Sequence, residues 1–115
     1  MAPRVYLAGP MTGYPEFNAT GFAEGERYAK SQGWDVASPQ NTDPAHEGLC
    51  PDGDRHTTDA GSHPYPCWIK ASLRMMLDCD AVLMLPGWEK SRGARLERSV
   101  AETCSMPVHE MPVAS

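Results

Sequence analysis

The segment Asp80–Glu102, DAVLMLPGWEKSRGARLERSVAE, decides the fold that we expect for this chain. Within it, Ala81–Leu85 is an uninterrupted run of apolar residues that ends at a Pro-Gly turn. A strand that is buried on both faces of a parallel sheet has this composition. After the turn, Ser91 is a natural N-cap for a helix that begins at Arg92. The segment therefore predicts a buried strand, a turn and the start of a helix.

Glu97 has unusual neighbours in that expected helix. Residues three and four positions apart share a helix face, and around Glu97 these are small or apolar: Gly93, Ala94, Val100 and Ala101. Glu102, in contrast, has Arg98 one turn before it, as in an ordinary solvated ion pair. A glutamate on the apolar side of its own helix is uncommon without a functional reason. Glu97 is therefore the candidate catalytic residue; the alternative is a side chain that reaches solvent past small neighbours.

The other periodic segments predict an α/β fold. Asn18 or Thr20 would cap the first helix, and Gly33 would end it. A strand, a helix and a second strand in this order form a βαβ unit with a right-handed crossover. We expect one domain over residues 1–115, a Rossmann- or flavodoxin-like three-layer sandwich with a central parallel sheet of about four to five strands. The expected elements are strands at 4–8, 34–37 and 106–111 and helices at 17–32 and 68–79.

A glycine-rich turn follows the first expected strand. In an open α/β sheet the ligand lies beyond the C-terminal ends of the strands, and glycines let backbone N–H groups approach it closely. The turn is neither a GxGxxG nor a Walker A sequence, so simple turn chemistry explains it equally well. Its candidate ligand-binding residues are Gly9, Pro10, Met11, Thr12 and Gly13.

Between the second expected strand and the next helix the periodicity disappears. The segment at about 39–66 is dense in Pro, Gly, Asp and His, and we interpret it as a lid-like loop. Tyr65 and Trp68 at its end would supply an aromatic wall for a flat ligand. A metal site is the alternative, but the spacing matches no structural zinc site, and we expect no metal and no cofactor. The residues that suggest a metal are His46, Cys50, Asp52, Asp54, His56, Asp59, His63 and Cys67.

Composition excludes several kinds of partner. A net charge of −5 and a pI near 5.2 argue against nucleic acid, because no basic stripe is available to neutralise phosphates. No run of residues has transmembrane length and no signal peptide is recognisable, so we expect a cytoplasmic protein with no membrane partner. In a reducing compartment a disulfide between Cys50 and Cys67 is not expected.

Two stretches resemble the nucleoside 2-deoxyribosyltransferase-like superfamily, in particular its small phage and bacterial branch. They are VYLAGPMTG, which begins at Val5, and CDAVLMLPGWEKSRGARLE, which begins at Cys79. In that superfamily a glutamate attacks C1′ of a (deoxy)ribonucleoside, expels the base, and is freed by a second base or by water. The S-x-G-x-x-x-E motif places this nucleophile at Glu97. The resemblance also implies a homodimer or a larger homo-oligomer.

Ser91 bears on the substrate class. The nucleoside transferases tend to have an aspartate at the matching position, whereas the nucleoside 5′-monophosphate hydrolases have a phosphate-binding serine there. A hydroxyl beside the first N–H groups of a helix suits a phosphate, and Arg92 would add charge; the alternative for Ser91 is an ordinary N-cap. One departure stands out, because Ser72 occupies the place of an aspartate that is common in the family. Serine cannot act as a carboxylic acid, so either Asp78 or a lid residue replaces it, or the rate is low, or the site binds without turnover.

The resemblance and the residues together predict an N-glycosidase that cleaves the base–sugar bond of a nucleoside 5′-monophosphate, with a deoxyribose sugar favoured. A nucleoside 2-deoxyribosyltransferase and a catalytically silent nucleotide-binding or sensor protein are the alternatives, and a purely structural domain is a weaker one. Tyr6, Trp68 or Trp88 would flank the base. The expected substrate-binding residues are Tyr6, Gly9, Pro10, Met11, Thr12, Gly13, Asn18, Trp68, Trp88, Ser91, Gly93 and Ala94.

Overall fold

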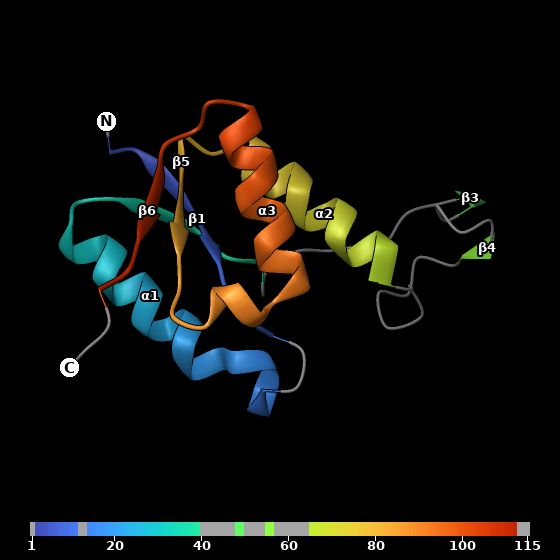
Figure 1. The fold of residues 1–115 in the computed structure, drawn as a ribbon, viewed down its shortest axis with the longest axis horizontal. Helices are drawn as coiled ribbons and strands as arrows, with labels where there is room; N and C mark the ends of the chain where they lie inside the picture. The colour runs from blue at the N-terminus through green and yellow to red at the C-terminus, as the bar shows by residue number, and fades with distance from the viewer. Residues whose placement is uncertain (1, 12–13, 40–47, 50–54, 57–64, 113–115) are drawn as a thin grey trace.

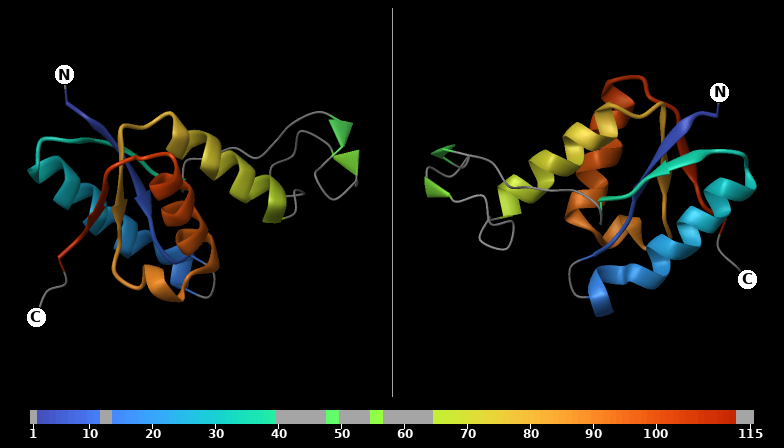
Figure 2. Two further views of the ribbon diagram at one scale, coloured as in Figure 1. Left: turned by 45° about the horizontal axis from the view of Figure 1, so that its top comes forward. Right: turned by 180° about the vertical axis from the view of Figure 1, so that it is seen from behind.

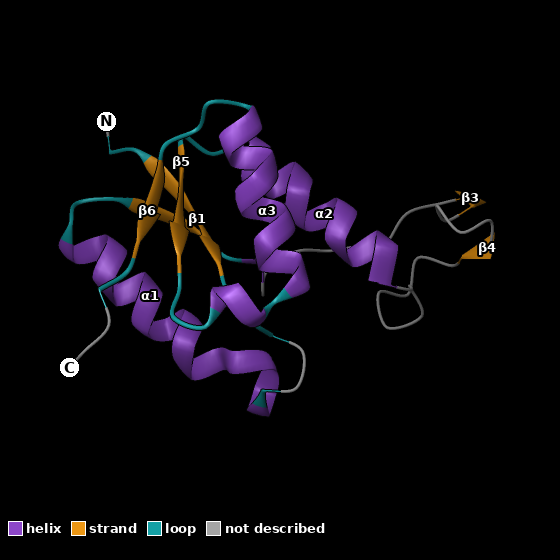
Figure 3. Ribbon diagram, viewed as in Figure 1, coloured by secondary structure: helices purple, strands orange, loops and turns teal. Residues whose placement is uncertain are grey.

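The computed structural model describes residues 2–11, 14–39, 48–49, 55–56 and 65–112. A parallel four-stranded sheet forms the centre, and helices cover both of its faces (Figures 1 and 3). The strand order is β2-β1-β5-β6. The expected α/β sandwich is therefore confirmed. Its sheet is built from β1 (Arg4–Ala8), β2 (Asp35–Ala37), β5 (Ala81–Met84) and β6 (Val108–Glu110).

The two central strands, β1 and β5, are buried because helices pack on both sides of them. Successive side chains of a strand point to opposite faces, and the two core clusters follow this alternation. Val5 and Leu7 of β1 pack with Phe22 and Ala29 of α1 (Ala19–Ser31) on one face. On the other face, Tyr6 and Ala8 join residues of α2 (Tyr65–Leu77) and α3 (Arg92–Thr103). The two views of Figure 2 show α1 on one side of the sheet and the other two helices on the opposite side.

The ends of several elements differ from the expected ones. The expected helix at 17–32 is a short 3₁₀ turn, η1 (Pro15–Asn18), followed by α1. Asn18 does occupy the N-cap position of α1, but its backbone is left-handed and its side chain makes no capping hydrogen bond. Gly33, with φ +82°, follows the helix as expected. The second long helix begins at Tyr65, three residues before the expected start, because Pro66 fits the first turn of a helix without loss of a hydrogen bond.

Most of the expected lid-like loop lies outside the described residues. Two short strands within it, β3 (Gly48–Leu49) and β4 (Arg55–His56), pair antiparallel, and no period-2 pattern predicts either of them. They stand apart from the sheet, beyond the first residues of α2 (Figure 2). Among the described residues, no three His, Cys, Asp or Glu side chains gather as a metal site would require. No helix in that part of the chain is long and apolar enough to cross a membrane.

Candidate active site

Ser91, the predicted N-cap, caps the start of α3 with its side chain. Ser91 Oγ accepts a hydrogen bond from the backbone N–H of Ala94 at 3.2 Å, so the predicted N-cap is confirmed. The connection from β5 contains a 3₁₀ turn, η4 (Trp88–Lys90). Because β5 and β1 are adjacent and parallel, the residues that follow them meet at one edge of the sheet. Their chains then turn to opposite faces of the sheet, and ligands bind at such a position in doubly wound folds.

A cavity of about 980 Å³ opens at this edge. Its size is at the upper end of the range of about 300–1,000 Å³ that is usual for small-molecule sites. Its walls come from the segment after β1, from η1, from Pro39 shortly after β2, from the first turns of α2, from η4 and from the start of α3. The lining residues are Gly9, Pro10, Met11, Tyr14, Glu16, Phe17, Ala19, Pro39, Trp68, Ile69, Ser72, Lys90, Ser91, Arg92, Gly93, Ala94 and Glu97.

Glu97 lies in the wall of this cavity and is only 5% exposed. With Ala94 and Ala101, it forms the buried stripe of α3, so its predicted place on the apolar helix face is confirmed. The small neighbours leave space for a side chain from the sheet. Tyr6 fills it, and its Oη donates a hydrogen bond to Glu97 Oε2. No second hydrogen bond to the Glu97 carboxylate is present among the described residues.

Burial governs the electrostatics of this pair. Loss of water around the carboxylate raises the pKa of Glu97 from 4.5 to about 7, and the hydrogen bond from Tyr6 lowers it in part. The pKa of Tyr6 is raised far above its ordinary value, mainly by burial and next by the nearby Glu97 carboxylate. Tyr6 therefore keeps its proton at every physiological pH and acts as a fixed donor. Glu97 is ionised in about half of the molecules near neutral pH.

Ser72 extends the pair into a chain of three side chains. It lies on α2, is 9% exposed, and lines the cavity. Its side chain hydrogen-bonds Tyr6, which lowers the Tyr6 pKa. The three side chains thus connect α2, β1 and α3 at one wall of the cavity. Asp78, the expected replacement for a missing acid, is exposed beyond the C-terminal end of α2 and does not line the cavity.

Most of the predicted ligand-binding residues do meet in the cavity. Tyr6 does not, because it is fully buried behind Glu97 and cannot stack on a base. Asn18 is likewise not among the described residues that line the cavity, while Thr12 and Gly13 lie outside the described part of the chain. The predicted residues that the cavity does bring together are Gly9, Pro10, Met11, Trp68, Ser91, Gly93, Ala94 and Glu97.

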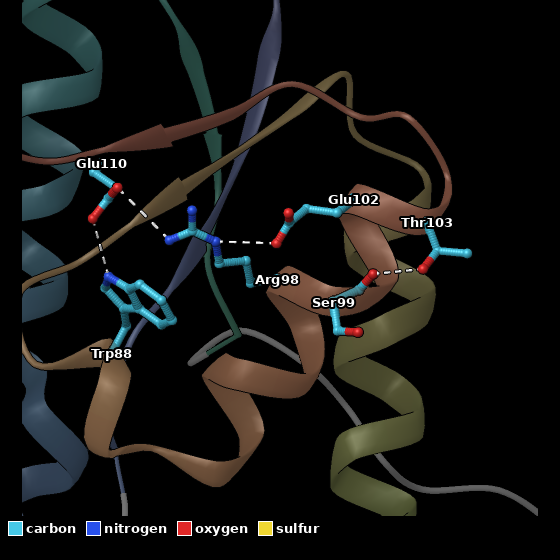
Figure 4. A network of polar contacts seen from close by, with 6 residues as sticks. All are labelled: Trp88, Arg98, Ser99, Glu102, Thr103 and Glu110. Atoms are coloured by element: carbon cyan, nitrogen blue, oxygen red, sulfur yellow. Dashed lines mark hydrogen bonds and ion pairs between the residues drawn. The ribbon is translucent and has the colours of Figure 1, made fainter.

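Trp88 has a packing role and not the predicted place beside a base. Its ring lies under the guanidinium of Arg98, 4.5 Å from the ring centroid, and its Nε1 donates to Glu110 Oε1 at 3.4 Å (Figure 4). Arg98 also pairs with Glu110 at 3.7 Å and with Glu102 at 3.2 Å. These contacts connect η4, through Trp88, and α3, through Arg98, to β6, which is an edge strand of the sheet.

Sequence reasoning missed several cavity residues. Tyr14, Glu16 and Phe17 precede or interrupt the expected helix, and the periodicity carried no signal that η1 would turn them toward the ligand site. Ile69 and Lys90 also line the cavity, although neither is among the predicted ligand-binding residues. Only the position of Lys90, one residue before the N-cap serine, could have suggested a contact.

The comparisons with known proteins point to one family. No curated protein matches the chain. The family described as "Domain of unknown function (DUF4406)" matches residues 3–110. That match includes β1, Ser72 and the whole of the β5–α3 segment, and hence every residue of the Ser72–Tyr6–Glu97 chain. The protein accordingly belongs to the DUF4406 family.

Proposed function

We propose that the protein cleaves the N-glycosidic bond of a nucleoside 5′-monophosphate, with Glu97 as the nucleophile. The observation that carries the proposal is the Glu97 carboxylate, which is buried in the wall of a large cavity and oriented by Tyr6. A structural glutamate would be expected to pair with a cation, and no described cation pairs with this one. The resemblance to the nucleoside 2-deoxyribosyltransferase-like superfamily supports the same role.

The chemistry suits this carboxylate. Departure of the base leaves positive charge on the sugar ring, and an adjacent carboxylate stabilises that charge and then captures C1′. Because Tyr6 holds Oε2, Oε1 is the oxygen that attacks. Water then cleaves the new C1′–O bond and restores Glu97. Only the ionised carboxylate attacks, so the rate should rise with pH through about 7.

The start of α3 supplies a site for the phosphate. The N–H groups of Arg92 and Gly93 have no carbonyl partner within the helix, and the helix dipole favours an anion there. Lys90 and Arg92, which flank Ser91 in the chain, line the same cavity. Ser91 already accepts from Ala94 through its oxygen, which leaves its hydroxyl proton to donate to a phosphate oxygen.

The test is the release of free base from a panel of nucleoside 5′-monophosphates. The wild type and a Glu24→Gln control, which changes an exposed glutamate on α1, should release base, and Glu97→Ala should not. Release without any added acceptor base identifies a hydrolase, whereas dependence on an acceptor identifies a transferase. Absence of release by the wild type across the whole panel would refute the enzyme.

One observation favours a second candidate, a catalytically silent nucleotide-binding protein. The cavity presents Ser72, and not a carboxylic acid, beside Tyr6. No residue is therefore assigned to donate a proton to the leaving base. This candidate predicts a nucleotide-dependent rise in melting temperature with no base release. It also predicts the same nucleotide affinity in wild type and Glu97→Gln. A melting temperature that no nucleotide raises would instead indicate a structural role for the domain.

A further inference from the structure

The connection between β5 and α3 carries a cavity residue that the helix itself does not hold in place. Ser91 is the N-cap of α3, so the helix fixes it, whereas Lys90 lies before the helix, in the 3₁₀ turn η4, and lines the same cavity. Local backbone hydrogen bonds shape the turn, such as the one that Lys90 N–H donates to the Gly87 carbonyl at 3.1 Å. Gly87 has φ +89°, and none of the three residues of η4 is buried. The position of Lys90 therefore depends on what holds η4 against the rest of the molecule.

Trp88 attaches η4 to the body of the protein. Its side chain packs against the core cluster on the α3 face of the sheet. The Arg98 guanidinium carbon lies 4.5 Å from the centroid of its ring, and the indole Nε1 donates to Glu110 Oε1 at 3.4 Å (Figure 4). The ring thus contacts α3 on one side and β6 on the other. Neither Trp88 nor Arg98 is among the described residues that line the cavity, so neither is placed to contact a ligand there.

Two carboxylates orient the Arg98 guanidinium over that ring. Its Nε pairs with Glu102 Oε1 at 3.2 Å, and its Nη1 pairs with Glu110 Oε2 at 3.7 Å. The side chains of both glutamates are 61% exposed, and exposed ion pairs contribute little to stability. A planar guanidinium, however, pairs with carboxylates in its own plane while it stacks on an aromatic face, and this combination fixes its direction. The network therefore determines where η4 lies more than it determines how stable the fold is.

The network joins η4 to the helix turn that bears the nucleophile. Arg98 follows Glu97 directly in α3, and the two side chains leave the helix in different directions. Glu97 accepts from Tyr6 in the core, whereas Arg98 reaches the edge strand β6. Because hydrogen bonds make the helix backbone rigid between them, the contact of Arg98 with Trp88 fixes the place of η4 relative to Glu97. Lys90 follows Trp88 by two residues in the same turn, so the contact also fixes the place of Lys90.

We infer that Arg98 is a positioning residue, which holds Lys90 beside the phosphate of the substrate by way of Trp88. Only ligands with a 5′-phosphate should depend on Arg98, because Lys90 has an anionic partner in those ligands alone. This inference rests on the proposed nucleotide site and adds to it a residue that sets its preference for a nucleotide over a nucleoside. The size of the effect is limited by the contact that holds the turn, and a cation over an exposed aromatic ring corresponds to a factor of about 2 to 5.

The test measures affinity calorimetrically in the Glu97→Gln background, where no turnover is expected. The probes are the 5′-monophosphates of deoxyadenosine, deoxyguanosine, deoxycytidine and thymidine, and the four nucleosides without phosphate. Arg98→Gln should weaken nucleotide binding about threefold and leave nucleoside affinity unchanged. Arg98→Lys keeps a cation over the ring, so its nucleotide affinity should stay within about twofold of the parent. Arg95→Gln, the matched control, removes the same charge from an exposed position of α3 and should change neither affinity.

A double-mutant cycle distinguishes positioning from a general effect on the structure. Lys90→Gln should weaken nucleotide binding about tenfold, because the phosphate loses a charged donor, and Arg98→Gln added to it should cause no further loss. A further loss of about threefold in the Lys90→Gln background, an equal loss for the nucleosides, or the same loss in Arg95→Gln would overturn the role of Arg98. Unchanged nucleotide affinity in Arg98→Gln would overturn it as well. An unchanged melting temperature in Arg98→Gln shows that the fold is intact.

The outcomes keep the positioning role and the proposed activity apart. Nucleotide affinity that depends on Arg98, in a protein whose wild type releases no base, would support the positioning role and refute the glycosidase. Base release by an enzyme whose preference for nucleotides is the same in Arg98→Gln would do the reverse. If none of the four nucleotides binds to the wild type or to Glu97→Gln, the phosphate site and the positioning role are both wrong.

Discussion

Glu97→Gln should make the fold less sensitive to alkaline pH. Burial raises the pKa of Glu97 from 4.5 to about 7, so the folded protein holds a proton that the unfolded chain has already released. Stability therefore falls as pH rises from about 4.5 to about 7 and stays low above that range. The full difference corresponds to about 3 kcal/mol of unfolding free energy. This is a large share of the roughly 5–15 kcal/mol that stabilises a typical domain.

The measurement is urea unfolding, followed by circular dichroism, at pH 5 and pH 8.5. Between these values the linkage relation gives a loss of about 2.5 kcal/mol from Glu97 alone. The wild type and the exposed-site control Glu24→Gln should show it, and Glu97→Gln should not, because an amide stays neutral and still accepts from Tyr6. Equal pH dependence in wild type and Glu97→Gln would refute the claim that the buried carboxylate is destabilising when ionised.

Three further changes test other parts of the site. Tyr6→Phe removes the hydrogen bond that lowers the pKa of Glu97, so the pH–rate profile for base release should move to higher pH; an unmoved profile would contradict the pairing. Ser91→Asp should keep the α3 cap but repel a phosphate, with a melting temperature near that of the wild type and nucleotide affinity at least about tenfold lower; equal affinity would place the phosphate elsewhere. Gly9→Ala would bring a Cβ to 2.9 Å from Leu85 Cβ and should cost about 1–3 kcal/mol in urea unfolding, whereas an unchanged midpoint would show that the loop after β1 can move away.

Local patterns in the sequence predicted much of the fold and the catalytic candidate. The apolar run at Ala81–Leu85 indicated a strand covered on both sides, and β5 is buried along its length. Helical periodicity isolated Glu97 on the buried face of α3, and cap chemistry identified Ser91. These features depend on residues within one or two turns of each other, so the sequence contains all the information they require.

The contacts of those residues were decided only by the tertiary structure. Tyr6 and Glu97 are 91 positions apart in the chain, and they meet because β1 lies beside β5 and turns its even-numbered side chains toward α3. The same packing places Ser72 behind Tyr6, holds Trp88 against Arg98, and brings Glu16 into the cavity wall. A periodic pattern shows which face of an element is buried, but it does not show what covers that face. The order of the strands and the packing of the helices make that choice, because they determine which distant side chains share a cavity.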